Sequence, residues 1–366
     1  MDPRALLTLL LALVLPLLPV HPPGPDSTAT AATHASPVGP GWYLAVVDRD
    51  REAKSAEDRR TQRLVLVSPT GEARTVYRRP VSRTYGGFRL LDWSVDGSTA
   101  LLIAVEKDAA RAIRVDVATG AVLELPIPLF QSAVLDPDGT GLLATSWTSR
   151  EGERLVLDRI DWAGTRTRLV DSATASLIAG RNGTVLTGDP EHARVQLLVS
   201  TSDGRIVSRF RHRAYCNPVR WWDDRRLLEM CATRLDLVDP VTGSTARLTS
   251  RHARGDYSHL DAREVGGRLY VQADGGCGYS FVVRQTKGGA MKRLRVPGAV
   301  GSVWLVDAVG DELVLRHTKG CGGQRPRSVL SRFDPVHHRE RPLVVLGRHE
   351  AFSQIRVFGE VRAATY

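Results

Sequence analysis

A short turn phrase recurs along most of this chain, at steps of 42 to 49 residues and each time between two apolar runs. It is clearest in LDWSVDGSTALLIAV (91–105) and returns in VLDPDGTGLLATSW (134–147) and IAGRNGTVLTG (178–188). Four later copies are weaker. A period near 42 residues is that of a β-propeller blade. The equivalent turn positions are Gly97, Gly139, Gly183, Arg225, Gly267, Gly310 and Gly359.

A second phrase falls between successive copies of the first. It is an apolar run followed by a polar turn that ends in glycine, as in VDVATG (115–120) and LVDPVTG (237–243), and seven such phrases interleave with the first seven. Glycine and aspartate suit these positions because hairpin turns need a positive φ or a turn closed by a side chain. Two hairpins in each period predict blades of four antiparallel strands.

The two ends of the repeat array complement each other. Apolar runs at 42–47 and 64–67 precede the first complete copy and have no first strand of their own, whereas 352–366 is an opening phrase that no blade follows. A closed ring leaves no sheet edge exposed. We therefore predict an all-β, seven-bladed β-propeller, closed by a C-terminal strand or strands that complete the N-terminal blade. Six and eight blades are the alternatives.

The N-terminus has the pattern of a targeting segment. Arg4 precedes a leucine-rich run at 5–20, and the segment 29–31 offers a cleavage site with small residues. The run is too short and too interrupted by proline to span a membrane. We predict a signal peptide at 1–31, a flexible leader at 32–40 and one propeller domain at 41–366. The expected location is secreted or extracytoplasmic, without a membrane span after cleavage, and a retained N-terminal anchor is the alternative.

Export would permit disulfides among the four cysteines. Cys216 and Cys231 flank one predicted hairpin, and a two-residue turn at Asp223 and Asp224 would place them opposite each other. Cys277 and Cys321 are one repeat apart in matching glycine-rich contexts, which predicts a bridge between adjacent blades. The close cysteine or histidine pairs of zinc sites do not occur, so we expect no metal.

The chain carries a formal net charge of +10, almost entirely from arginine. A basic exported protein can attract anionic envelope polymers or acidic ligands. The arginines are spread along the chain without a nucleic-acid-binding motif, so most of them are expected on solvated surface and no nucleic acid is expected as a partner. We expect a monomer whose partner is an unknown protein or envelope ligand, with an anionic ligand as one option.

Catalytic signatures are missing from the sequence. It has no G-x-S-x-G elbow and no H-E-x-x-H motif, and its ten histidines are scattered. The Asp-x-x-x-Gly turns at 116–120 and 239–243 are not followed by the tryptophan that quinoprotein blades use. We therefore expect no cofactor.

The clearest phrases resemble a known repeat. Trp93 to Gly97 (WSVDG), followed by an apolar strand and then VDVATG (115–120), resembles the W-S-P-D-G repeat of TolB-type propellers, with Val95 in place of the usual proline. The resemblance extends from about residue 42 to the end, and the chain is similar to actinobacterial secreted proteins described as TolB-like. It implies a propeller that binds proteins or ligands in the cell envelope, and it carries over no catalytic residue.

Two hypotheses of function follow. The favoured one is a non-catalytic binding scaffold that meets its partner at glycine-rich loops on one face of the disc, because propeller sites gather on such loops. The alternative is a propeller enzyme of the lyase, lactonase or glycosidase kind with an axial-channel site, for which Asp256, Asp261 and Glu264 are candidates. The binding residues predicted by the first hypothesis are Gly275, Gly276, Gly278, Tyr279, Gly320, Gly322 and Gln324.

Overall fold

The computed structural model describes most of the chain after the predicted signal peptide. The predicted signal peptide and most of the predicted leader lie outside the described residues. The described ranges are 38–49, 60–81, 85–106, 109–127, 130–148, 154–180, 182–212, 215–250, 257–275, 279–319 and 327–364.

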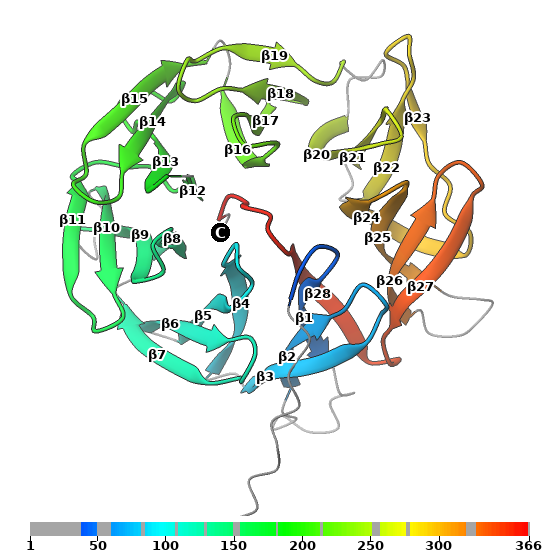
Figure 1. The fold of residues 1–366 in the computed structure, drawn as a ribbon, viewed down its shortest axis with the longest axis horizontal. Helices are drawn as coiled ribbons and strands as arrows, with labels where there is room; N and C mark the ends of the chain where they lie inside the picture. Colours follow the sequence, from blue (N-terminus) through cyan, green and yellow to red (C-terminus); the bar gives the residue numbers. More distant parts are fainter. Residues whose placement is uncertain are drawn as a thin grey trace, which may run out of the picture. The chain divides into compact units, whose positions relative to one another are not determined.

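Seven four-stranded antiparallel sheets stand around a central axis (Figure 1). The prediction of an all-β, seven-bladed propeller is therefore confirmed, and the described residues contain no helix. Six blades run outward in chain order from an inner strand that lines the axis. One blade is composite, with the order β28-β1-β2-β3.

The strands follow the repeat closely, and four of them fall in every period. The composite blade consists of β28 (Glu350–Val357), β1 (Tyr43–Arg49), β2 (Arg60–Val67) and β3 (Ala73–Val81). The next three blades are β4 (Tyr85–Trp93), β5 (Thr99–Glu106), β6 (Ala109–Asp116) and β7 (Val122–Ile127); β8 (Phe130–Leu135), β9 (Gly141–Trp147), β10 (Leu155–Asp161) and β11 (Arg166–Val170); and β12 (Leu177–Ala179), β13 (Thr184–Gly188), β14 (Val195–Ser200) and β15 (Ile206–Arg211). The last three are β16 (Cys216–Trp221), β17 (Leu227–Cys231), β18 (Arg234–Val238) and β19 (Thr245–Arg247); β20 (Tyr257–Val265), β21 (Arg268–Gly275), β22 (Tyr279–Gln285) and β23 (Met291–Arg293); and β24 (Ala299–Val309), β25 (Glu312–Lys319), β26 (Arg327–Asp334) and β27 (Arg339–Val345).

Ring closure uses one C-terminal strand. Strand β28 pairs antiparallel with β1 from Tyr43↔Val357 to Arg49↔Glu350, with one bulge. It takes the position of the first strand that the N-terminal blade lacks. The side chains of Phe352 and Val357 pack into the same apolar cluster as Tyr43 and Val47, so closure buries core as well as a sheet edge.

The turn glycines have the conformation that the sequence predicted. Six of the seven positions in the opening phrase are glycines with a positive φ, from 60° at Gly310 to 75° at Gly139. The second phrase has a positive φ at all seven copies, including His338 at 55°. The left-handed region is strained for residues with a Cβ, so glycine is favoured at these turns.

Neighbouring inner strands are joined by side-chain hydrogen bonds that repeat the blade period. The Asp92 carboxylate accepts a hydrogen bond from the backbone N–H of Leu135 at 2.9 Å. The Arg263 guanidinium donates to the carbonyl of Val306 at 2.9 Å. These partners are 43 residues apart in both cases. The repeat therefore fixes not only the blades but also the contacts between them.

Several tryptophans stand beside the opening phrases, and two of them fill space in the core. Trp93 and Trp221 do so, with exposed fractions of 3% and 9% in two separate core clusters. Trp304 is different because it lines a cavity in the axial channel.

The predicted disulfide between Cys216 and Cys231 is confirmed, and the two residues are directly paired across β16 and β17. The predicted two-residue turn is wrong. The chain turns between Trp222 and Arg226, whose backbone N–H and carbonyl are 2.8 Å apart. A bulge between Pro218 and Arg220 compensates for the longer turn and restores the register at the cysteines. The predicted Cys277–Cys321 bridge lies outside the described residues.

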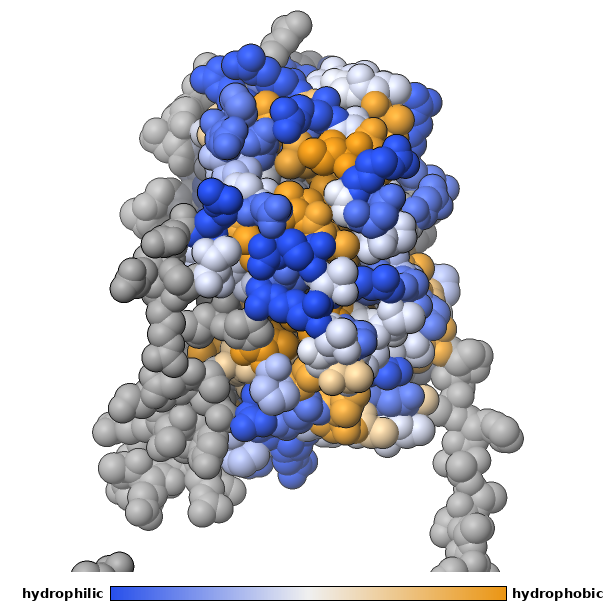
Figure 2. All heavy atoms as spheres, turned by 90° about the vertical axis from the view of Figure 1, so that its left-hand side faces the viewer, coloured by the Kyte–Doolittle hydropathy of each residue, from blue (hydrophilic) through white to orange (hydrophobic). Residues whose placement is uncertain are grey.

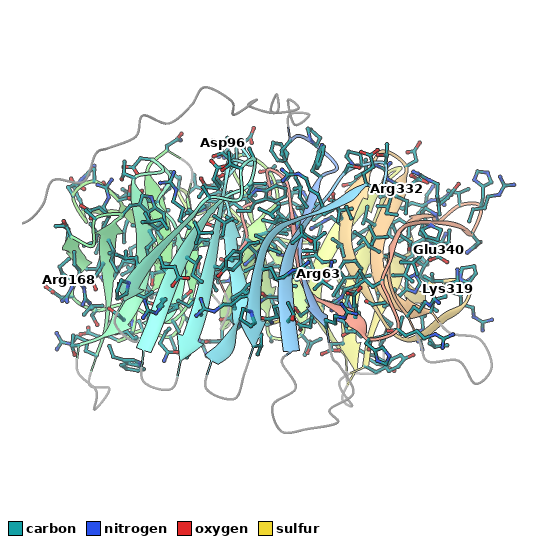
Figure 3. All side chains as sticks on the ribbon, turned by 90° about the horizontal axis from the view of Figure 1, so that it is seen from below. Arg63, Asp96, Arg168, Lys319, Arg332 and Glu340 are labelled. Atoms are coloured by element: carbon teal, nitrogen blue, oxygen red, sulfur yellow. A yellow bond between two sulfur atoms is a disulfide. The ribbon has the colours of Figure 1, made fainter. Side chains whose placement is uncertain are left out.

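The ring has two different faces (Figure 3). We call the side on which the inner strands end the turn face, marked by Asp96 in the turn after β4. We call the opposite side the loop face, where β21 and β25 end at Gly275 and Lys319. Along the outer wall near β11 and β15, apolar side chains are interrupted by polar ones (Figure 2).

Candidate functional site

The chain does not end at the closing strand but turns back into the axial channel (Figure 1). Gly359, with a φ of 71°, makes the turn after β28. The segment 360–364, which we call the tail, then lies along the inner strands β16 and β12. The backbone N–H of Ala363 donates to Val219 at 2.9 Å, and that of Ala364 donates to Leu177 at 2.8 Å. The tail therefore occupies part of the channel.

A buried ion network joins the tail to the inner strands. Asp261 on β20 contacts the guanidinium groups of Arg220 and Arg263 at 3.0 Å each and of Arg362 at 2.7 Å. Glu360 contacts Arg263 at 2.6 Å and Arg220 at 3.2 Å. Asp261 and Arg263 are two residues apart, so β20 presents both on one side. Two carboxylates thus share three guanidinium groups that come from separate elements.

The arginines hold both carboxylates in the ionised state. Burial alone would raise the pKa of Asp261, but Arg263, Arg362 and Arg220 together keep it well below its usual range. The same three arginines lower the pKa of Glu360 against its burial. Neither carboxylate is therefore available as a proton donor near neutral pH, and both are occupied by guanidinium groups.

A third carboxylate in the channel behaves differently. Asp307 on β24 lies 3.7 Å from Arg263 and lines a cavity of about 470 Å³ on the turn face. Burial raises its pKa to about 6, which Arg263 offsets only in part. A general acid or base needs a pKa near the working pH, and Asp307 comes nearer to this than Asp261 or Glu360.

Of the predicted loop-face residues, the structure describes Gly275 and Tyr279. Gly275 ends β21 and Tyr279 begins β22, whereas Gly276, Gly278, Gly320, Gly322 and Gln324 lie outside the described residues. Tyr279 is 40% exposed and lines a groove of about 610 Å³. We call this groove, lined by Tyr279, Phe281 and residues 292–296, 299, 301 and 303, the Tyr279 groove.

The Tyr279 groove combines aromatic rings with cations. The Arg293 guanidinium lies over the rings of Tyr279 and Phe281, at 5.4 and 5.0 Å from their centroids. Lys292 and Arg295 line the same groove and are exposed. Among the described residues, none of the three cations has a carboxylate oxygen within 4.0 Å, so their charge faces the solvent. Cations over aromatic faces suit ligands that carry both negative charge and a flat apolar side.

The candidates for catalysis are dispersed. Asp256 lies outside the described residues, Glu264 is exposed, and Asp261 belongs to the ion network. These three residues therefore do not form a common site in the described part of the chain.

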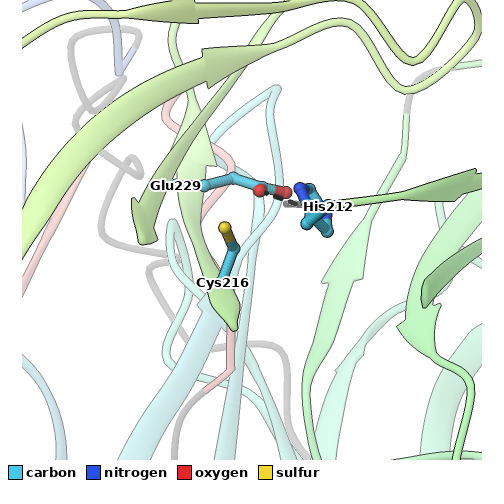
Figure 4. A group of neighbouring side chains, drawn as sticks. All are labelled: His212, Cys216 and Glu229. Carbon is cyan, nitrogen blue, oxygen red and sulfur yellow. Dashed lines mark ion pairs between the residues drawn. The ribbon is translucent and has the colours of Figure 1, made fainter. Parts of the chain in front are cut away.

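A second buried polar group lies between blades, beside the disulfide. His212 and Glu229 are 3.4 Å apart and almost fully buried, and Cys216 is adjacent (Figure 4). The three residues have metal-ligand chemistry, but the sulfur of Cys216 is bonded to Cys231 and cannot serve as a thiolate. Burial raises the pKa of Glu229 to about 8 and lowers the pKa of His212, so both side chains are neutral near pH 7.

Replacing Glu229 by glutamine should therefore change how stability depends on pH. The folded protein keeps this carboxyl protonated up to about pH 8, whereas the unfolded chain releases the proton above about pH 4.5. Glu229 therefore lowers the free energy of unfolding of the wild type as the pH rises from about 4.5 to about 8. The glutamine variant has no such titration and keeps this stability. We expect E229Q to exceed the wild type by about 2 to 4 kcal/mol above pH 8 and to match it near pH 4.5, in urea unfolding. Equal pH profiles for the two proteins, with the exposed E264Q as control, would contradict this assignment.

Comparisons with known proteins support the fold and no closer relationship. No protein-family model matches the chain, and no curated protein matches its sequence. The propeller domain of the trilobed protease from Pyrococcus furiosus matches with a TM-score of 0.56 and 12% identity, over 86% of this chain and 96% of that one. A prolyl endopeptidase matches with 12% identity and a TM-score of 0.56 over 87% of this chain, which spans about half (51%) of that enzyme.

TolB from Acinetobacter baumannii is also similar, with a TM-score of 0.43 and 14% identity, over 86% of this chain and 66% of that one. At these identities the similarities concern the fold. The seven closed blades confirm the β-propeller fold itself. Within the described residues, no helix is long and apolar enough to cross a membrane.

Proposed function

We propose that this protein is an exported, non-catalytic propeller that binds an anionic ligand of the cell envelope at the loop face. The observation that carries the proposal is the Tyr279 groove, in which Arg293 stacks on two aromatic rings. Lys292 and Arg295 lie beside it without a carboxylate partner among the described residues. An acidic polysaccharide has the matching chemistry, because sugar faces pack on aromatic rings and carboxylates pair with arginine.

Two further observations support parts of the proposal. The Cys216–Cys231 disulfide suits an oxidising compartment, as the N-terminal targeting pattern predicts. Asp261, the one enzyme candidate inside the channel, is occupied by three guanidinium groups. Of the predicted binding residues, Tyr279 lines this groove, and Gly275 ends the strand that precedes it.

The double substitution R293E/R295E should abolish binding of an acidic glycan. Isothermal titration with alginate fragments is expected to show saturable binding to the wild type and at least a tenfold loss in the variant, because two attractions become repulsions. Neutral dextran fragments of the same size should not bind. R268E is the matched control, since Arg268 begins β21 of the same blade on the turn face and is exposed.

The proposal would be abandoned if R293E/R295E bound alginate as tightly as the wild type and R268E. If the protein instead binds an acidic protein, and R293E/R295E loses this binding whereas R268E retains it, the groove remains the binding site but its ligand is a protein and not a glycan.

A further inference from the structure

A second cationic cavity lies inside the axial channel, separate from the Tyr279 groove. It has a volume of about 280 Å³ and lies between the tail and the strands β4, β24, β25 and β28. Arg316 of β25, Arg356 of β28 and Arg362 of the tail all line it. Three arginines from three separate elements thus line one cavity that is open to solvent.

Two of these arginines form no close ion pair among the described residues, although Asp92 and Glu360 attract Arg356 at longer range. Among the described residues, neither Arg316 nor Arg356 has a carboxylate oxygen within 4.0 Å. Arg316 donates to the carbonyls of Phe352 and Ser353 at 3.0 Å each, and Arg356 donates to the carbonyl of Leu91. These contacts use two of the five N–H donors of Arg316 and one of those of Arg356. Most of their donors remain for a group inside the cavity.

The surroundings hold these guanidinium groups in place. Arg316 lies over the Trp304 ring at 4.1 Å from its centroid, and the ring lines the same cavity. Burial lowers the pKa of Arg316 to about 10, and burial together with Arg362 lowers that of Arg356 to about 10. Both groups nevertheless remain charged near pH 7. A charge withdrawn from water is costly unless an opposite charge meets it.

The acidic groups of the channel do not meet this need. Asp261 and Glu360 are committed to Arg220, Arg263 and Arg362. Asp92, which attracts Arg356, has a pKa raised by its burial, and it accepts hydrogen bonds from the backbone N–H groups of Trp93 and Leu135. Among the described residues, Arg356 therefore has only the longer-range attraction of Asp92 and Glu360, and burial alone shifts the pKa of Arg316.

We propose that this cavity binds a small oxyanion, a phosphate or a small dicarboxylate, between Arg316 and Arg356. The planar guanidinium fork matches both chemistries, and the two arginines approach from adjacent blades. Gln354 also lines the cavity; its Oε1 accepts a hydrogen bond from the backbone N–H of Leu90, which leaves its Nε2 as a further donor. A volume of about 280 Å³ suits one small anion, and this cavity shares no lining residue with the proposed glycan groove.

Titration calorimetry on the full-length protein in a low-salt buffer tests this site, with sodium phosphate and sodium succinate as separate probes. We expect one saturable site per chain for at least one probe, and the stronger probe identifies the chemistry. R316Q and R356Q should each weaken binding at least tenfold. R316K should recover only part of the loss, because lysine keeps the charge without the fork.

The control R293E/R295E should bind the small anion like the wild type, because its substitutions lie in the Tyr279 groove. If the glycan proposal fails, the test of the anion cavity still stands. If the anion cavity binds neither probe, the test of the glycan groove still stands. Circular dichroism establishes whether each variant is folded. If R356Q does not fold, R316Q alone tests the site. The proposal is overturned if neither probe gives saturable heat, or if folded R316Q binds phosphate and succinate as tightly as the wild type.

Discussion

Replacing Asp261 by alanine is expected to lower the free energy of unfolding by about 3 to 5 kcal/mol. The side chain is 4% exposed and contacts Arg220, Arg263 and Arg362. Without it, buried guanidinium groups from three elements repel one another, and Glu360 remains to compensate, with Asp307 near Arg263 alone. Urea unfolding monitored by tryptophan fluorescence measures the loss.

The control for this substitution is Glu264→Ala on the same strand. Glu264 is exposed, so its removal should change stability by less than about 0.5 kcal/mol. Asp261→Asn keeps the shape of the side chain but removes its charge. Its loss of unfolding free energy should lie between those of the two alanine variants. A loss below about 1 kcal/mol for D261A would show that the network contributes little to stability.

Removing residues 346–366 is expected to prevent cooperative folding. The truncation deletes β28, so β1 loses a seven-residue ladder and its edge is exposed. It also removes Phe352 and Val357 from the core, each worth about 1.5 to 3 kcal/mol. Together with the lost hydrogen bonds, at about 1 kcal/mol each, the loss reaches the whole stability of an ordinary domain, about 5 to 15 kcal/mol.

Complementation makes this prediction specific to ring closure. A synthetic peptide of residues 346–364 added to the truncated chain should restore a sharp unfolding transition and the near-ultraviolet circular dichroism of the native protein. The same peptide with Phe352→Asp should not. A truncated chain that unfolds cooperatively on its own would contradict the role assigned to β28.

The fold was predictable because local turn chemistry repeats. Each blade needs a residue with positive φ at fixed places, and glycine at those places is visible in the sequence, as at Gly97 and Gly120. The Cys216–Cys231 pair was found for the same reason, although the bulge at 218–220 shows that a correct pairing can follow from an incorrect turn. Local signals therefore sufficed for the architecture.

The ion network was not predicted, because its contacts are far apart in the chain. Asp261 and Arg362 are 101 residues apart, and nothing local distinguishes Arg362 among fifty basic residues. The sequence held one weak signal. Asp261 and Arg263 alternate on an inner strand, where two apolar residues would be expected, and Glu360 and Arg362 alternate in the same way. Charged residues with period two on the innermost strand point to the channel.

The Tyr279 groove was only partly anticipated. The repeat placed Tyr279 on the loop face, but Lys292, Arg293 and Arg295 follow an unremarkable turn and reach the groove only because β23 pairs with β22. Their role in the groove can be recognised only when β23 is placed beside β22.

Hydrogen–deuterium exchange with bound alginate fragments locates the ligand on the propeller and so tests whether it binds at the Tyr279 groove. We expect slower exchange in peptides that cover β23 and the segment 292–299, which border the groove, with no change around Asp96 on the turn face. Protection at the turn face, or none anywhere at saturating ligand, would contradict this expectation.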